Sequence, residues 1–157
     1  DIDVANFNAP GQIVISGAEE GIDQAIAGAK EKGIRIAKKL EVAGAYHSRL
    51  MKSAQDQLVP VLGEASMSSP PIPVYCNVDA RPVTDDADIR ETLARQVSGS
   101  VRWSESIQKL IAKGHSTFLE LGPGGILAGL MKRIDKSVNV IRIEDLDSIE
   151  AAVTALS

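Results

Sequence analysis

Apolar residues along this chain fall into two patterns, short continuous runs and longer stretches in which they recur every three or four positions. The first pattern predicts strands and the second predicts amphipathic helices. Residues 19–32 follow the helical pattern, and Gly33 is suited to end that helix. Strands are predicted at residues 4–7, 12–16 and 35–40. The result is a ββαβ unit whose first two strands form a hairpin around the turn at residues 8–11.

The remaining chain alternates short apolar runs with longer helical stretches. Strands are predicted at residues 73–77, 117–121 and 139–142. Helices are predicted from His47 to about residue 62 and at residues 89–96, 103–112, 125–134 and 148–156. Strands that alternate with helices in this way are typical of a parallel α/β sheet. The strands of such a sheet need neighbours on both faces and both edges.

Composition narrows the class of protein. Of the 157 residues, 44% are hydrophobic but only 3% are aromatic, so a core must be mainly aliphatic. The net charge of −4 argues against nucleic acid as a partner. No apolar run approaches the ~20 residues of a membrane span, and the N-terminus does not resemble a signal peptide. A single cysteine, Cys76, excludes an internal disulfide and favours a reducing compartment, which we expect to be the cytoplasm.

His47 is the one histidine with a chemical context, because it lies where a loop enters a predicted helix. Such a position can face a cleft, and histidine is the side chain best suited to move a proton near neutral pH. Taken alone, the residue is more simply explained as a surface or helix-capping histidine. His115 lies in an exposed turn. Two histidines without acidic or cysteine neighbours at ligand spacing predict no metal site.

Three further features have structural explanations. Residues 120–125 (Glu-Leu-Gly-Pro-Gly-Gly) lie between a predicted strand and a predicted helix, where a glycine-rich turn can bind phosphate. The spacing of a nucleotide-binding loop is absent and Pro123 removes an N–H donor, so a tight structural turn is favoured. Arg95 and Gln96 end a predicted helix, where a cation is favourable. Cys76 lies within a predicted strand and is expected to be buried.

Several stretches, taken in order, match the motifs of one family. They are residues 6–17 (Asn-Phe-Asn-Ala-Pro-Gly-Gln-Ile-Val-Ile-Ser-Gly), 44–51 (Gly-Ala-Tyr-His-Ser-Arg-Leu-Met), 73–78 (Pro-Val-Tyr-Cys-Asn-Val), 95–97 (Arg-Gln-Val), 101–103 (Val-Arg-Trp) and 120–124 (Glu-Leu-Gly-Pro-Gly). The chain resembles the malonyl-CoA:acyl-carrier-protein transacylases of bacterial fatty-acid synthesis. No single stretch is specific, but the ordered set covers essentially the whole chain.

The resemblance implies an α/β-hydrolase-like core that carries a ferredoxin-like subdomain. Residues 1–42 would form the ββαβ part of that subdomain, and residues 43–157 would form the C-terminal part of the core. The family's nucleophile is a serine in a Gly-x-Ser-x-Gly turn, and no such turn occurs in the 157 residues. The chain also starts without a methionine. We therefore expect the C-terminal half of a longer enzyme, inactive alone and with apolar surface left exposed.

The resemblance also implies roles for individual residues. His47 matches the general base that activates the serine, and Gln96 matches the residue whose backbone carbonyl orients that histidine. We therefore predict a hydrogen bond from a ring nitrogen of His47 to the Gln96 carbonyl, with no carboxylate within reach of that nitrogen. Because a backbone carbonyl survives substitution, Gln96→Ala should reduce activity less than His47→Ala. Asn6, Asn8 and Gln12 match polar residues near the substrate cleft.

The implied reaction moves a malonyl group from malonyl-CoA to the phosphopantetheine thiol of acyl carrier protein through a serine acyl-enzyme. It needs no metal and no bound cofactor. Arg35, Lys132 and Arg133 stand out in an acidic chain and are either solvated charges or a docking surface for the acidic carrier protein. The implied partners are malonyl-CoA, the carrier protein and the enzyme's N-terminal half. Two alternatives stay open: an acyltransferase domain of a polyketide synthase, and a carrier-protein-binding module without chemistry.

Overall fold

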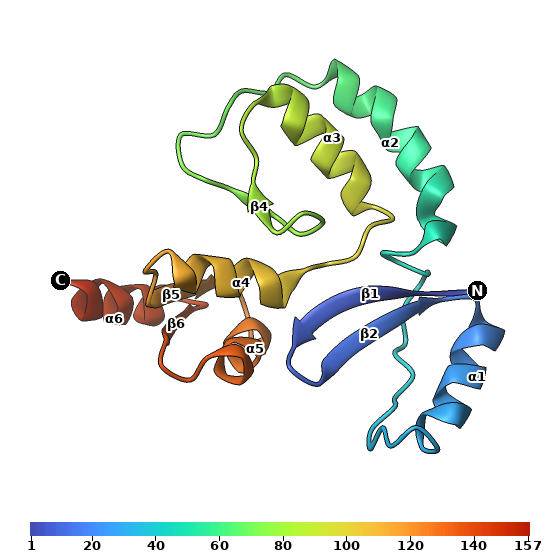
Figure 1. Ribbon diagram of the computed structural model, residues 1–157. Helices are drawn as coiled ribbons and strands as arrows, with labels where there is room; N and C mark the ends of the chain where they lie inside the picture. Colours follow the sequence, from blue (N-terminus) through green and yellow to red (C-terminus); the bar gives the residue numbers. More distant parts are fainter.

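The computed structural model describes all of residues 1–157. Figure 1 shows a hairpin followed by helix α1, a pair of helices α2 and α3, and a C-terminal group of helices around two short strands. The elements are β1 (Ile2–Ala9), β2 (Gln12–Gly17), α1 (Glu19–Ala29), the 3₁₀ turn η1 (Arg49–Met51), α2 (Lys52–Glu64), β3 (Tyr75–Cys76), β4 (Arg81–Pro82), α3 (Asp86–Gln96), α4 (Trp103–Ala112), β5 (Thr117–Leu121), α5 (Ile126–Ile134), β6 (Asn139–Ile143) and α6 (Leu146–Leu156). The chain is therefore α/β.

Strands β1 and β2 form the predicted hairpin. They pair antiparallel around the turn at Pro10 and Gly11, with shifts in register at Ala5 and at Asn8. Gly11 has a φ of 72°, which glycine adopts without the steric cost of a Cβ. The opposite edge of β1 is also occupied, because the Phe7 N–H donates to the Val101 carbonyl (2.8 Å) and the Val101 N–H donates to the Ala5 carbonyl (2.7 Å). The segment that follows α3 is thereby fixed against the hairpin.

Helix α1 ends at Ala29, three residues before the predicted end at residue 32, but the turn that follows it closes at Gly33, as predicted. The Ile34 N–H donates to the Ala29 carbonyl (3.0 Å), and the Gly33 N–H donates to the Lys30 carbonyl (3.1 Å). Gly33 has a φ of 76°. This pair of bonds around a left-handed glycine is the Schellman motif, which satisfies carbonyls that the helix leaves free at its C-terminus.

The prediction of a strand at residues 35–40 is wrong. These residues form no regular structure and are all exposed, because they pair with no other strand and an extended run needs such pairing to become a strand. The segment is instead held by Lys39, whose Nζ lies 2.8 Å from a Glu19 carboxylate oxygen and 2.9 Å from an Asp23 carboxylate oxygen on α1. The N-terminal unit is thus ββα rather than ββαβ. A ferredoxin-like subdomain and a boundary after residue 42 stay predictions.

The strand predicted at residues 73–77 also needs correction. Strand β3 contains only two residues and pairs antiparallel with β4, instead of joining a parallel sheet. The chain reverses between them, with the fully buried Ala80 at a φ of 49°. The Val83 N–H also donates to the Val74 carbonyl (3.0 Å), and Pro73, the residue before Val74, has no N–H with which to extend this ladder. Cys76 is buried, as predicted, and burial raises the pKa of its thiol.

The predicted parallel pattern is confirmed in the C-terminal part of the chain. Strands β5 and β6 pair parallel and in register, from Thr117 opposite Asn139 to Leu121 opposite Ile143, with α5 as the connection. The helices predicted to start near Trp103, Ile126 and Ser148 are present as α4, α5 and α6. No third strand joins this sheet, so the structure contains a single parallel pair.

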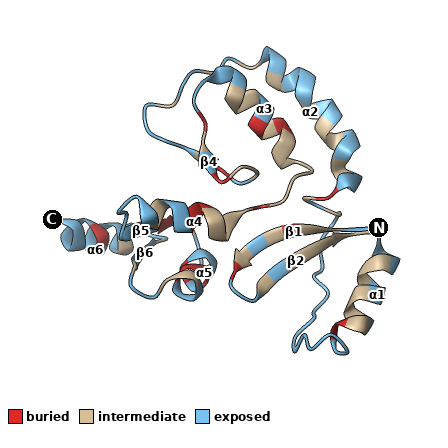
Figure 2. Ribbon diagram, viewed as in Figure 1, coloured by how far each residue is buried: buried red, intermediate tan, exposed pale blue.

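Little of the chain is buried. Only 17 of the 157 residues are buried (Figure 2), and the accessible surface is 10451 Å². A compact monomer of 16.6 kDa has about 7,600 Å² by the surface–mass relation. Large apolar side chains remain in solvent on the C-terminal elements, among them Leu121, Ile126 and Leu146, which are 74%, 79% and 78% exposed. The exposed apolar surface predicted from the sequence is therefore confirmed.

Candidate functional site

His47 lies in a short, tightly bonded loop that leads into η1. The buried Ser48 fixes this loop: its hydroxyl donates to the Ala45 carbonyl (2.6 Å) and accepts from the Leu50 N–H (3.3 Å), which caps η1. His47 itself has a φ of 58°. A left-handed conformation is unfavourable for a residue with a Cβ, and such strain is concentrated at functional sites. The loop therefore holds the half-buried imidazole in one direction.

The Nδ1 atom of His47 lies 3.0 Å from the Gln96 carbonyl oxygen and 3.0 Å from the Gly99 carbonyl oxygen. A carbonyl oxygen only accepts, so Nδ1 must carry the proton and share it between the two acceptors. In the neutral ring the lone pair then belongs to Nε2, which makes no hydrogen bond. The predicted contact with Gln96 is confirmed, and both acceptors are carbonyls rather than carboxylates. The Gly99 carbonyl was not predicted.

The two carbonyls are available because α3 ends beside the histidine. The Gly99 N–H donates to the Arg95 carbonyl (2.8 Å), which is the last bond of the helical ladder. The carbonyls at a helix C-terminus are unpaired and carry a partial negative charge. Gly99 is also required sterically, since a Cβ there would lie 2.6 Å from Val78 Cγ2 and 2.7 Å from the Arg95 oxygen. A glycine just after a predicted helix was the sequence signal for this second acceptor.

The loop after α3 is anchored on both sides. On one side, the Ser98 hydroxyl donates to the Gln55 side chain on α2. On the other, the Ser100 hydroxyl donates to the Val4 carbonyl on β1 (2.6 Å). The Gln96 side chain makes a third contact, because its Oε1 accepts from the Asn77 N–H (2.7 Å). These bonds link α2, β1 and the β3–β4 ribbon to the carbonyls that hold the imidazole.

Arg49 ties the histidine loop to strand β1. Its backbone N–H and its guanidinium both donate to the Asp3 carboxylate, at distances of 2.7 to 3.1 Å. The hydrogen bonds from Arg49 lower the pKa of Asp3 from its usual 3.8 to about 2. Because the two residues are far apart in sequence, this ion pair fixes the start of the chain against the His47 loop.

A second set of ion pairs supports the other side of the site. Arg95, the neighbour of Gln96, makes a two-pronged contact with Asp79 at 2.6 and 3.0 Å. Arg81 makes a similar contact with Asp88 at 2.6 and 2.8 Å and holds the pKa of that carboxyl well below its usual range. These pairs connect α3 with the β3–β4 ribbon that carries Asn77.

The residues predicted to bind substrate all lie on the β1–β2 hairpin. Asn6 lies on β1 opposite Val101, and both Asn6 and Asn8 are half-buried. Gln12 lies at the hairpin turn, where its side chain accepts from Arg133 Nη1 (2.8 Å). Arg133 Nη2 also contacts the Pro10 carbonyl (3.3 Å). The structure thus brings together two residues to which the sequence assigned different roles, and Arg133 links α5 to the hairpin.

The two other predicted docking cations, Arg35 and Lys132, are exposed and make no ion pair. Arg35 lies in the irregular segment after α1, and Lys132 lies on α5. Their role in docking stays a prediction.

The glycine-rich turn after β5 is structural, as predicted. The buried Glu120 carboxylate accepts from the backbone N–H groups of Leu127 (2.8 Å) and Ala128 (2.9 Å) in the first turn of α5. These N–H groups are the ones that would bind a phosphate. Because a carboxylate of the chain itself already pairs with them, the turn is not a nucleotide site.

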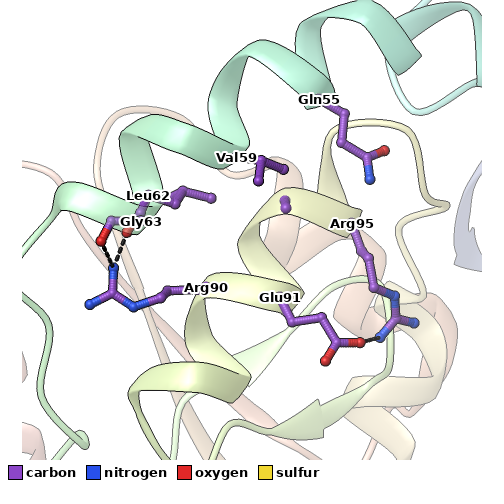
Figure 3. Close-up of a pocket in the computed structure, with 8 residues that line it drawn as sticks. Gln55, Val59, Leu62, Gly63, Arg90, Glu91 and Arg95 are labelled. Atoms are coloured by element: carbon purple, nitrogen blue, oxygen red, sulfur yellow. Dashed lines mark hydrogen bonds and ion pairs between the residues drawn. The ribbon is translucent and has the colours of Figure 1, made fainter.

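A shallow groove of about 400 Å³ separates α2 from α3 (Figure 3). Gln55, Val59 and Leu62 line one wall, and Arg90 crosses to the carbonyls at the end of α2. His47 does not line this groove. No group of three or more histidine, cysteine or acidic residues lies close enough to hold a metal ion. None of the helices has the length and apolar character needed to cross a membrane.

Comparisons with known proteins show which proteins this chain resembles. The chain is 44% identical over 155 residues to the malonyl CoA-acyl carrier protein transacylase of Bacillus subtilis, covering 99% of this chain and 49% of that protein. An acyl carrier protein S-malonyltransferase from Vibrio cholerae superposes with a TM-score of 0.93 at 38% identity, over 96% of this chain and 49% of that one. A malonyl-transacylase in complex with a type II polyketide acyl carrier protein gives 0.96 at 35% identity, over 99% and 50%.

The chain spans about half the length of the curated relatives that it matches. The acyl transferase domain family matches residues 1–151, which include His47, both of its carbonyl partners and the whole hairpin. The chain therefore belongs to the acyl transferase domain family.

Proposed function

We propose that this chain supplies the general base of a malonyl-CoA:acyl-carrier-protein transacylase. The observation that carries the proposal is the His47 imidazole, whose Nδ1–H is fixed by two backbone carbonyls while its Nε2 lone pair is free. A group held in this way accepts a proton from a hydroxyl in one direction only, which is the task of the base in serine acyl transfer. The likeness to named transacylases supplies the substrate class.

The proposed reaction has two halves. In the first, Nε2 of His47 takes the proton of a serine hydroxyl while the serine oxygen bonds to the thioester carbon of malonyl-CoA. The C–S bond breaks, and the CoA sulfur leaves with the proton from Nε2. In the second half, Nε2 takes the proton of the carrier protein's phosphopantetheine thiol, the sulfur attacks the serine ester, and the serine oxygen regains the proton.

The positive charge that His47 gains in each half needs a counter-dipole. In a Ser-His-Asp triad a buried carboxylate stabilises the imidazolium and fixes its tautomer. Here the Gln96 and Gly99 carbonyls, at the negative end of α3, fix the tautomer and offer a partial charge. This arrangement stabilises the charged ring less than a carboxylate does.

The serine in this proposal comes from outside the 157 residues. No Gly-x-Ser-x-Gly turn occurs in the sequence, and the chain spans about half the length of its relatives. The exposed side chains on β5, α5 and α6 supply a surface on which a complementary segment would pack. Asn6, Asn8 and Gln12 are proposed to contact substrate, and Arg35 and Lys132 to meet the acidic carrier protein. No metal or bound cofactor is needed for these steps.

A chimera tests the proposal. Residues 1–157 replace the matching half of the Bacillus subtilis transacylase, with which they share 44% identity. Cooperative thermal unfolding first establishes that the chimera is folded. We expect it to transfer malonyl from CoA to acyl carrier protein, and we expect His47→Ala to lower kcat roughly 10⁴-fold or more. His115→Ala is the matched control and should leave the rate unchanged, because His115 lies in an exposed turn.

Two results would contradict the proposal. A His47→Ala chimera with most of its activity would show that another group acts as the base. A folded chimera that binds the carrier protein without transferring malonyl would favour a binding module.

The pathway is a separate question. The neighbour solved with a polyketide carrier protein favours testing a second carrier. Comparing kcat/KM of the chimera for fatty-acid and polyketide carrier proteins distinguishes the two pathways.

A further inference from the structure

Gln96 makes two contacts in different directions. Its backbone carbonyl accepts from His47 Nδ1 (3.0 Å), and its side-chain Oε1 accepts from the backbone N–H of Asn77 (2.7 Å). The side chain therefore does not touch the imidazole. It instead attaches the last residue of α3 to the turn that follows β3.

Asn77 holds the same loop at its other end. Its carbonyl accepts from the Arg102 N–H (2.9 Å), while its N–H donates to Gln96. The N–H and the carbonyl of Asn77 thus bind the two ends of residues 96–102, the segment that carries both carbonyl partners of His47. Removing the Gln96 acceptor would break the contact at residue 96 and leave the contact at Arg102 in place.

The direction of the Gln96 carbonyl depends on the rotation of the peptide that follows it. Residues at the end of a helix have fewer backbone bonds to fix that rotation. The carbonyl is one of two atoms that set the direction of the His47 ring. A displacement of about 1 Å in a catalytic group can lower a rate roughly a hundredfold. A contact that holds this carbonyl in place therefore bears on catalysis without reaching the substrate.

We propose that the side-chain amide of Gln96 is a positioning group, which directs its own backbone carbonyl at His47 by binding the Asn77 N–H. This inference rests on the proposed function of His47 as a base. It gives the Gln96 side chain a role separate from that of its carbonyl. It also explains why Gln96, which contacts His47 through its backbone, carries a long side chain with an acceptor at its end.

Two substitutions separate the acceptor from the bulk of the side chain. Gln96→Met keeps the length and removes the amide oxygen. Gln96→Glu keeps an acceptor of the same length for the Asn77 N–H. The first should disturb His47, and the second should restore it. If the Gln96 side chain only filled space, Gln96→Met would preserve the state of His47 better than Gln96→Glu, because Met fills the same space while Glu adds a charge.

The tautomer of His47 provides a readout that does not depend on activity. The chain has only two histidines, so a long-range ¹H–¹⁵N spectrum of the 157-residue chain contains two imidazoles, and His115→Ala assigns them. At pH 8, where ordinary imidazoles are neutral, we expect the Nδ1–H tautomer at His47 in the wild-type chain. Gln96→Met should give a mixture of tautomers, and Gln96→Glu should retain Nδ1–H. An unchanged tautomer in Gln96→Met would overturn the inference.

Kinetics in the chimera give the second readout. Gln96→Met should lower kcat roughly ten- to a hundredfold with little change in KM, and Gln96→Glu should recover most of the loss. Equal rates for Gln96→Met and the unmodified chimera would overturn the inference, while the proposed function would stand. An active chimera that is insensitive to His47→Ala would overturn the proposed function, while the tautomer measurement would still decide the role of Gln96.

Discussion

The region around His47 and the region around β5 and β6 are built in opposite ways. Around His47, segments distant in sequence are joined by polar bonds, such as those from Arg49 to Asp3 and from Ser100 to the Val4 carbonyl. Around β5 and β6, the backbone ladder is in register but large apolar side chains such as Leu121 stay in solvent. The first region is held together by polar bonds, whereas the second lacks packing partners for its apolar side chains.

This difference shows what each kind of interaction requires. A hydrogen bond needs two partners at a set distance, and the chain contains both partners for the imidazole, the loop and the end of α3. Burial of a sheet face needs a whole covering layer, and the face of β5 that carries Leu119 and Leu121 has no such layer. The chain thus positions its proposed base by itself, while the exposed face of β5 has no covering segment.

The largest expected effect concerns catalysis by the chain alone. The polar framework around His47 positions the proposed base, but the 157 residues contain no Gly-x-Ser-x-Gly turn for that base to activate. Removing a nucleophile from a unit of this kind costs roughly 10⁶-fold in rate. We expect the isolated chain to transfer malonyl at least that much more slowly than the chimera, measured as labelled acyl carrier protein. Turnover by the isolated chain at the chimera's rate would show that the nucleophile lies within it.

The next effect compares two leucines in the C-terminal region. Leu130 on α5 is 8% exposed, and Leu121 on β5 is 74% exposed. Leu130→Ala should lower the free energy of unfolding by about 2–5 kcal/mol, since it leaves a cavity. Leu121→Ala should change it by less than about 0.5 kcal/mol in the isolated chain. Urea denaturation of both variants measures the difference. Equal losses would mean that the β5 face is covered in the isolated chain, for example by self-association.

A smaller effect concerns the backbone at His47. Its φ of 58° penalises any residue with a Cβ, at roughly 1–2 kcal/mol. His47→Ala and His47→Gly both lose the imidazole, but only the glycine variant relieves this strain. We expect His47→Gly to be the more stable of the two by about 1 kcal/mol. At Met51, whose φ of −86° is ordinary, the same pair of substitutions should give the opposite order. The same order of stability for the Ala and Gly variants at both positions would contradict the conclusion that the loop is strained.

The smallest effect is the acid dependence of the Asp3–Arg49 contact. The pKa of Asp3 is about 2 in the folded chain, below its usual 3.8. A lowered folded-state pKa stabilises the fold above the unfolded-state value, and this contribution is lost as the pH falls from about 4 through about 2. Asp3→Asn should therefore flatten the loss of stability across that range, whereas Glu41→Gln in the irregular segment should not. An Asp3→Asn variant with the wild-type acid profile would show that the contact does not contribute.

The sequence predicted local structure better than strand pairing. Signals for helix ends lie in a few neighbouring residues, and Gly33 closes the turn after α1 as expected. The run at residues 35–40 has the composition of a strand but pairs with no other strand, and a local pattern cannot reveal whether pairing occurs. The prediction of a parallel strand at residues 73–77 was wrong for the same reason, since β3 pairs with the short β4 rather than with a parallel neighbour.

The site was predictable in part. The contact between His47 and the Gln96 carbonyl followed from the likeness of short stretches to a known family, and the structure has it. Two contacts were not predicted: the Gly99 carbonyl as second acceptor, and the hydrogen bond between the Gln96 side chain and Asn77. Both depend on how α3 ends against the β3–β4 ribbon. Those contacts join residues that lie well apart in the chain, so no spacing rule exposes them.

The rate of acyl-enzyme formation tests the central claim most directly, namely that His47 is the base for a serine supplied by another segment. The chimera is mixed rapidly with malonyl-CoA, and the release of CoA is followed within the first turnover. We predict a burst equal to the enzyme concentration in the unmodified chimera and in His115→Ala. We predict no burst on the same timescale in a folded His47→Ala chimera. A full burst in His47→Ala at the unmodified rate would contradict the account.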